Sequence, residues 1–168
     1  MSARSRGCAA EPDPRHAAIG QVLHPGDVAL AERGERLETL LGSCVAIVLT
    51  DPRRTLGAMC HIVYCKPATS GTKVSAAGAG VALGRMYALL RSRGIEPRLC
   101  EAYVYGGGNM FPALFDQAHV GEDNAQWALD ALAQDGVQVL FHDLGGNTYR
   151  RLSWAVGPDM PQVTAVAV

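Results

Sequence analysis

Apolar residues along this chain gather in short runs bounded by turn residues, a pattern typical of a fold built mostly of strands. The clearest run is SCVAIVLT (43–50), which is continuously apolar and rich in β-branched residues, as expected of a buried strand. DPRR (51–54) follows as a turn with proline at a favoured position, and TLGAMCHIVYC (55–65) is the return strand. Further strands are expected at 27–31, 36–42, 98–108 and 137–146, with a terminal hairpin over 149–168 around GPDMP.

Two stretches have the spacing of helices instead. Residues 77–93 predict a helix that ends at Gly94, with four apolar residues on its buried side: Val81, Met86, Leu89 and Leu90. Residues 121–136 predict a second helix, acidic at its start and ended by Gly136. Many strands combined with two helices indicate an α+β domain with a layered sheet core.

Length and composition fit one soluble domain. Residues 1–18 have no period and are expected to form a disordered tail, which leaves 19–168 as a single domain of the 168-residue chain. A net charge of −1 produces no global field that attracts nucleic acid or anionic lipid. No apolar run approaches the roughly 20 residues of a membrane-spanning helix, and the N-terminus lacks the apolar core of a secretory signal. Five cysteines without a regular framework favour free thiols in a reducing cytoplasm.

The hairpin over 43–65 places one cysteine opposite one histidine. If a loop of two or four residues joins the strands, Thr50 faces Thr55 and Cys44 faces His61, with directly opposed Cβ atoms about 4.5–5.5 Å apart. An odd loop would shift the pairing by one residue and separate the two side chains. A thiol and an imidazole that share a proton make a nucleophile and its base, and the imidazole can lower the thiol pKa. The alternative is a buried cysteine that acts only as a small hydrophobic residue, opposite a histidine bonded to a carbonyl.

Residues near this pair suggest further contacts with a substrate. Gly42 and Ser43 precede Cys44 and allow a tight backbone whose N–H groups can hold a developing oxyanion. GGGNMF (106–111) and DLGGN (143–147) are expected as glycine turns with positive φ. If these turns border the Cys44 cleft, Asn109 and Asn147 can bind a substrate amide.

Several other polar residues receive structural interpretations. Asn124 is expected at a helix start, and Arg150 and Arg151 on a solvated face or in contact with acidic helices. Cys60, His61 and Cys65 lack a fourth zinc ligand, and strand alternation separates the first two, so neither a metal nor a cofactor is expected.

The segments LLGSCVAIVLTD and LGAMCHIVYC resemble the chemoreceptor glutamine deamidase family, CheD. The resemblance continues through EAYVYGGGNMF (101–111), VGEDNAQWALDALAQDGVQV (120–139) and DLGGNTYRR (143–151). It implies a cytoplasmic enzyme that converts selected glutamines of chemoreceptor signalling helices to glutamate and ammonia, with related members acting on glutamyl methyl esters. It also implies a mixed β-sheet core flanked by helices, similar to the toxin deamidases, and in some bacteria a partner, the phosphatase CheC. By motif position, Cys44 resembles the nucleophile and His61 the general base.

The residue that orients His61 is left open by the resemblance. The family pattern has a threonine six residues before the cysteine, where this chain has Glu38; Thr39 lies five before. Thr39 can fill the role if the backbone bulges near Gly42, and Glu38 can fill it as a carboxylate; Thr39 is favoured. GAG (78–80) replaces an aromatic residue and an aspartate common in the family, which allows a specialised or inactive member.

Two other functions compete with deamidation of receptors. One is a regulatory binding module for CheC-like partners or receptor helices, with catalysis secondary or lost. The other is an amidase for a small free substrate.

Overall fold

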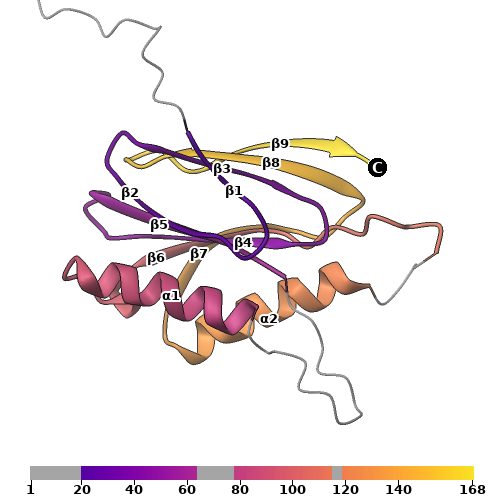
Figure 1. Cartoon of the computed structure of the whole chain (residues 1–168). Helices are drawn as coiled ribbons and strands as arrows, with labels where there is room; N and C mark the ends of the chain where they lie inside the picture. The colour runs from indigo at the N-terminus through magenta and orange to yellow at the C-terminus, as the bar shows by residue number, and fades with distance from the viewer. Residues whose placement is uncertain (1–19, 64–77, 115–118) are drawn as a thin grey trace, which may run out of the picture.

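The computed structural model describes residues 20–63, 78–114 and 119–168, and within them the chain forms three layers (Figure 1). A four-stranded sheet packs on a five-stranded sheet, and two helices cover the far face of the five-stranded sheet. The strands are β1 (Gln21–Leu23), β2 (Val28–Glu32), β3 (Arg36–Leu41), β4 (Val45–Thr50), β5 (Leu56–Ile62), β6 (Glu101–Gly106), β7 (Gln138–Leu144), β8 (Thr148–Ala155) and β9 (Gln162–Ala167). The helices are α1 (Ala79–Ser92) and α2 (Val120–Gln134), with a short 3-10 turn, η2 (Pro97–Leu99).

Both sheets contain parallel and antiparallel pairs. The five-stranded sheet has the order β2-β5-β4-β6-β7, in which only β6 and β7 run parallel. The four-stranded sheet has the order β1-β3-β8-β9, in which only β1 and β3 run parallel. The expected α+β fold with a layered, mixed-sheet core is therefore confirmed, while the likeness to toxin deamidases stays a prediction. The helices lie on one side of the sheets only.

The central strand β4 is buried on both faces, which explains its continuous apolar sequence. One face contributes to the core between the two sheets, and the other to the core between the five-stranded sheet and the helices. Neighbouring residues of β5 are divided in the same way: Met59 belongs to the core between the sheets, whereas Cys60 belongs to the core beneath the helices. His61, next in the strand, therefore faces the space between the sheets.

The predicted strands and helices are confirmed with small shifts at their ends, and β1 was not predicted. Gly94 and Gly136 follow α1 and α2 with positive φ, as expected of residues that stop helices. The prediction that Val81 and Leu89 are buried is wrong, because they are 51% and 36% exposed. The buried stripe of α1 consists of Ala79, Ala82, Leu83, Met86 and Leu90, so the predicted burial of Met86 and Leu90 is confirmed. The predicted tail (1–18) and Cys65 lie outside the described residues.

Four short connections pass between the two sheets, and two of them flank β3. β2 lies in the five-stranded sheet and β3 in the four-stranded sheet, so residues 33–35 form a crossing between layers. The chain returns through residues 42–44, which precede β4. The backbone does not continue one pleat across these connections, so the side-chain alternation of β3 does not extend into β4.

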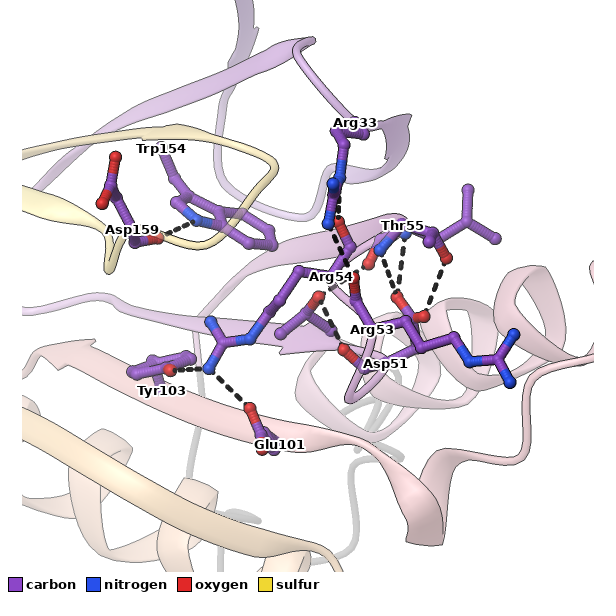
Figure 2. A network of polar contacts seen from close by, with 11 residues as sticks. Arg33, Asp51, Arg53, Arg54, Thr55, Glu101, Tyr103, Trp154 and Asp159 are labelled. Carbon is purple, nitrogen blue, oxygen red and sulfur yellow. Dashed lines mark hydrogen bonds and ion pairs between the residues drawn. The ribbon is translucent and has the colours of Figure 1, made fainter.

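The turn between β4 and β5 is wider than the sequence predicts, and it sets the register of this hairpin. The Asp51 carboxylate accepts hydrogen bonds from the backbone N–H groups of Thr55 and Leu56 and from the Thr55 hydroxyl (Figure 2). Arg54, with φ of 58°, extends across to Glu101 and to the Tyr103 hydroxyl. These contacts incorporate residues 51–56 into the turn, so the first paired residues are Thr50 and Gly57.

Candidate active site

The register of the hairpin corrects the predicted pairing of Cys44 with His61. His61 lies opposite Ala46, because the turn contains six residues between the first paired positions instead of four. Because six is also an even number, Cys44 and His61 still lie on the same face of the hairpin. Cys44, two residues before Ala46, packs against the same core between the sheets. The thiol and the imidazole are thus diagonal neighbours on one face, a step farther apart than directly opposed residues.

A buried threonine holds the His61 ring from the opposite sheet. Thr39 on β3 is 2% exposed, and its Oγ1 lies 2.8 Å from Nδ1 of His61. The same hydroxyl donates to the Leu23 carbonyl at 2.8 Å. Because a hydroxyl has one hydrogen, Thr39 accepts from His61, so Nδ1 bears the proton and Nε2 of the neutral ring has the free lone pair. Nε2 is buried and has no hydrogen-bond partner among the described residues.

Glu38, the alternative to Thr39, lies on the other face of β3. Its carboxylate accepts a hydrogen bond from the Ser153 hydroxyl at 3.0 Å, and it lines a hollow of about 230 Å³ together with Leu40 and Arg151. The bulge near Gly42, which the sequence analysis set as a condition, is not needed for Thr39 to reach His61. Thr39 and His61 belong to facing sheets, and residues 42–44 cross between those sheets.

Burial favours the neutral forms of both the thiol and the imidazole. Burial raises the pKa of the half-buried Cys44 thiol, and the Cys44 backbone N–H opposes this effect by lowering it. Burial lowers the pKa of His61, and the Leu23 carbonyl and the charge of Asp27 partly offset that shift. The ring is therefore a neutral base at neutral pH, and the thiol keeps its proton until a reaction begins.

Three successive carbonyls before and at the cysteine accept hydrogen bonds from other elements. The Gly42 carbonyl accepts from Gly108 N–H at 3.0 Å, and the Cys44 carbonyl from Gly107 N–H at 2.9 Å. Between them, the Ser43 carbonyl accepts from the side-chain amide of Asn124 at 2.7 Å. Asn124 is fully buried inside α2, not a residue of the helix start. Sequence reasoning missed this contact, for which the only signal is a polar residue on an otherwise apolar helix face.

The two predicted glycine turns lie side by side next to Cys44. Gly145 N–H donates to the Gly106 carbonyl at 2.9 Å, and Asn109 N–H donates to the Gly146 carbonyl at 2.8 Å. The Asn109 side chain shapes its own turn, because its Oδ1 accepts from Phe111 N–H at 3.1 Å. Asn147 is exposed, and its carbonyl accepts from Val168 N–H. The turns thus border the cysteine as expected, and the role of Asn109, Asn147 and Ser43 toward a substrate stays a prediction.

Arg150 does not lie on a solvated face, so that prediction is wrong. Its side chain is 4% exposed and donates to Asp143 at 2.9 Å, to the Gly145 carbonyl at 2.8 Å and to the Gly106 carbonyl at 3.4 Å. The cause is the alternation of β8, which points Arg150 between the sheets and leaves Arg151 exposed. Arg150 therefore fixes both glycine turns from within. In the described part of the chain, no cluster of potential ligands is arranged to hold a metal ion.

A buried hydroxyl that holds an imidazole, with a thiol on the same face, is the arrangement expected of a cysteine-dependent hydrolase. Residues 67–158 match the family model described as CheD chemotactic sensory transduction. The chain is 34% identical over 142 residues to the probable chemoreceptor glutamine deamidase CheD 2 of Albidiferax ferrireducens, covering 82% of each protein. It therefore belongs to the CheD family.

Other relatives extend across bacteria and archaea. The probable chemoreceptor glutamine deamidase CheD of Pseudomonas syringae pv. syringae is 33% identical, covering 78% of this chain and 76% of its own length. That of Methanococcus maripaludis is 30% identical, covering 76% and 83%. A crystal structure of a Neisseria meningitidis protein of the DUF152 family aligns with a TM-score of 0.45 and 16% identity, over 78% of this chain and 65% of the other. Neither helix in the described ranges is long and apolar enough to cross a membrane.

Proposed function

We propose that this protein hydrolyses the side-chain amide of selected glutamines in the cytoplasmic signalling helices of chemoreceptors, releasing glutamate and ammonia. The names of its relatives support the substrate, because the chain covers most of their length. The observation that best supports the chemistry is the hydrogen bond between Thr39 and Nδ1 of His61, which leaves Nε2 as a buried base, while Cys44 packs against the same core between the sheets.

The reaction proceeds through a thioester on Cys44. His61 Nε2 takes the thiol proton as the sulfur attacks the carboxamide carbon, and the carbonyl electrons move onto oxygen. When that tetrahedral intermediate collapses, the C–N bond breaks and His61 returns the proton to the departing nitrogen as ammonia leaves. Water then loses a proton to His61 as it attacks the thioester, and the thiolate departs and is reprotonated. A glutamyl methyl ester follows the same path with methanol as the leaving group.

The neutral resting state of Cys44 and His61 protects the thiol until a substrate binds. A thiol with a raised pKa resists alkylation and oxidation while the site is empty, and proton transfer to His61 accompanies attack on a bound amide. Cys44 is only partly buried, which supports access for a helix that presents a glutamine. Ser43, Asn109 and Asn147 are the residues we propose for contact with that substrate, and a CheC-type phosphatase is the partner proposed by family resemblance.

Mass mapping of a chemoreceptor cytoplasmic domain tests the proposal. The receptor is co-expressed with the wild-type protein, with Cys44→Ala, and with Cys60→Ala as a control whose thiol faces the helix layer. We expect amide-to-acid conversion at specific glutamines with the wild type and with Cys60→Ala, and none with Cys44→Ala. Conversion that persists in Cys44→Ala rejects the nucleophile. A wild type that binds receptor without any conversion identifies a binding module, and conversion of free glutamine alone identifies a small-molecule amidase.

A further inference from the structure

The N-terminal part of α2 packs directly on the glycine turn that supports the cysteine. A Cβ at Gly121 would overlap with the backbone of Gly107 and Gly108, so the helix approaches this turn with no side chain between them. The Gly107 and Gly108 N–H groups hold the carbonyls on either side of Ser43. One helical turn after Gly121, Asn124 then reaches the Ser43 carbonyl at 2.7 Å.

The Ser43 carbonyl and the Cys44 N–H belong to the same peptide group, so the hydrogen bond from Asn124 also fixes the direction of the Cys44 N–H. No cis peptide occurs among the described residues, and in a trans peptide the C=O and N–H bonds point in opposite directions. Asn124 holds the Ser43 carbonyl toward α2, on the helix side of the five-stranded sheet. The Cys44 N–H is therefore directed away from the helices, toward the space between the sheets that His61 faces.

That direction places the amide where negative charge develops during attack by Cys44. The Cys44 N–H lowers the pKa of its own thiol, which agrees with an amide on the sulfur side of the backbone. An N–H group of the nucleophile's own residue, fixed in advance, is a common donor to the oxyanion of a tetrahedral intermediate. A peptide with a free carbonyl can rotate and lose this orientation.

We infer that Asn124 is a positioning residue, whose amide locks the Ser43–Cys44 peptide so that the Cys44 N–H donates to the oxyanion. The inference rests on the proposed role of Cys44 as nucleophile. It does not depend on which acyl compound Cys44 attacks, so it can be measured apart from receptor deamidation.

Two reactions of Cys44 separate this role from a general loss of structure. Acyl transfer from p-nitrophenyl acetate forms a tetrahedral oxyanion, whereas alkylation by iodoacetamide displaces iodide and forms none. The comparison uses Asn124→Ala, Asn124→Asp, which keeps the side-chain shape but removes the donor, and Gln126→Ala, whose amide donates to Asp130 on the exposed face of α2. Cys44→Ala serves as the background for both reactions.

We expect both Asn124 variants to acylate roughly 10- to 100-fold more slowly, which is less than the roughly 10²- to 10³-fold loss on removing an oxyanion donor outright, because the Cys44 N–H is released but still present. Alkylation should stay within about twofold of the wild type when both rates are taken at the pH plateau, where the thiol is fully ionised. Gln126→Ala should match the wild type in both reactions. If acylation and alkylation fall together in both Asn124 variants, or if neither falls, the positioning role is wrong. Receptor deamidation by the wild type is measured separately. If the wild type does not deamidate a receptor but the Asn124 variants still lose acylation alone, the proposed function fails and the positioning role stands.

Discussion

Replacing Thr39 with valine tests whether the hydroxyl beside His61 has a catalytic consequence beyond stability. Valine has nearly the same shape, so the buried packing is kept while two hydrogen bonds are lost: the donation to the Leu23 carbonyl and the acceptance from His61 Nδ1. A buried polar group without a partner costs about 1–3 kcal/mol. The Leu23 carbonyl also interacts with His61, so the two orphaned groups can partly satisfy each other. We therefore expect unfolding free energy to fall by about 1–3 kcal/mol in total.

The catalytic effect should exceed what this loss of stability explains. Without the Thr39 hydroxyl, only the Leu23 carbonyl is left to favour the proton on Nδ1, so part of the population can carry the proton on Nε2 and lose the lone pair that acts as the base. Replacing the carboxylate of a serine protease triad by an amide costs roughly 10⁴ in kcat for this reason, and a neutral hydroxyl binds the ring less strongly. We expect kcat to fall roughly 10- to 100-fold in Thr39→Val, with little change in KM.

Two further variants make the result interpretable. Thr39→Ser keeps the hydroxyl and should retain most of the activity. Thr50→Val removes a buried hydroxyl that donates to the Leu56 carbonyl at 2.8 Å, at the opposite end of β4, and should lower stability without affecting kcat. Denaturant unfolding gives the stability of each variant, and receptor deamidation gives the kinetics. If Thr39→Val loses stability but keeps the wild-type kcat, the hydroxyl has only a structural role as a buried hydrogen-bonding group. Our reasoning about the His61 tautomer is then refuted.

Two further expectations concern pH and the glycine turn. Because burial lowers the pKa of His61 below 6.5, activity should decline only below pH 6.5, and His61→Asn should abolish it. The unfolded chain then binds a proton near pH 6 that the folded protein excludes, so stability should fall as the pH drops below 6.5. Urea titrations at several pH values give the unfolding free energy, which should change less with pH in His61→Asn than in the wild type. An equal dependence on pH in the two proteins would contradict the assignment. Gly106→Ala adds a Cβ that overlaps with the Cys44 carbonyl at a φ of 116°, and should cost at least about 2 kcal/mol. Gly34→Ala, at a φ of 90° in open space, is its control for backbone strain alone and should cost less; equal losses would reject the predicted clash with Cys44.

Much of the fold follows from local sequence patterns. The apolar run of β4, the glycines that end both helices, and the final hairpin depend on the conformational preferences of neighbouring residues, which act without reference to the rest of the chain. The shared face of Cys44 and His61 was also predictable, because any even loop preserves it. The predicted burial of Val81 and Leu89 failed because the helix turns the face of Ala79, Ala82 and Leu83 toward the sheet, beside the correctly predicted Met86 and Leu90.

Other features were decided only by contacts between distant segments. The Asp51 carboxylate binds the backbone N–H groups four and five residues later, which widens the turn. As a result, His61 pairs across the hairpin with Ala46 and not with Cys44. Thr39 reaches His61 because β3 and β5 lie in facing sheets, an arrangement that counting residues before the cysteine does not reveal.

The support of the cysteine backbone is the feature farthest from local sequence. Asn124 and Ser43 are 81 positions apart, and they meet because α2 packs on a turn of glycines without intervening side chains. The sequence by itself determined that a thiol and an imidazole share one face of a hairpin, which makes them the candidates for the reaction. The tertiary structure decided which groups hold them, because hydrogen-bond partners from separate layers are chosen by the packing of those layers and not by the order of residues along the chain.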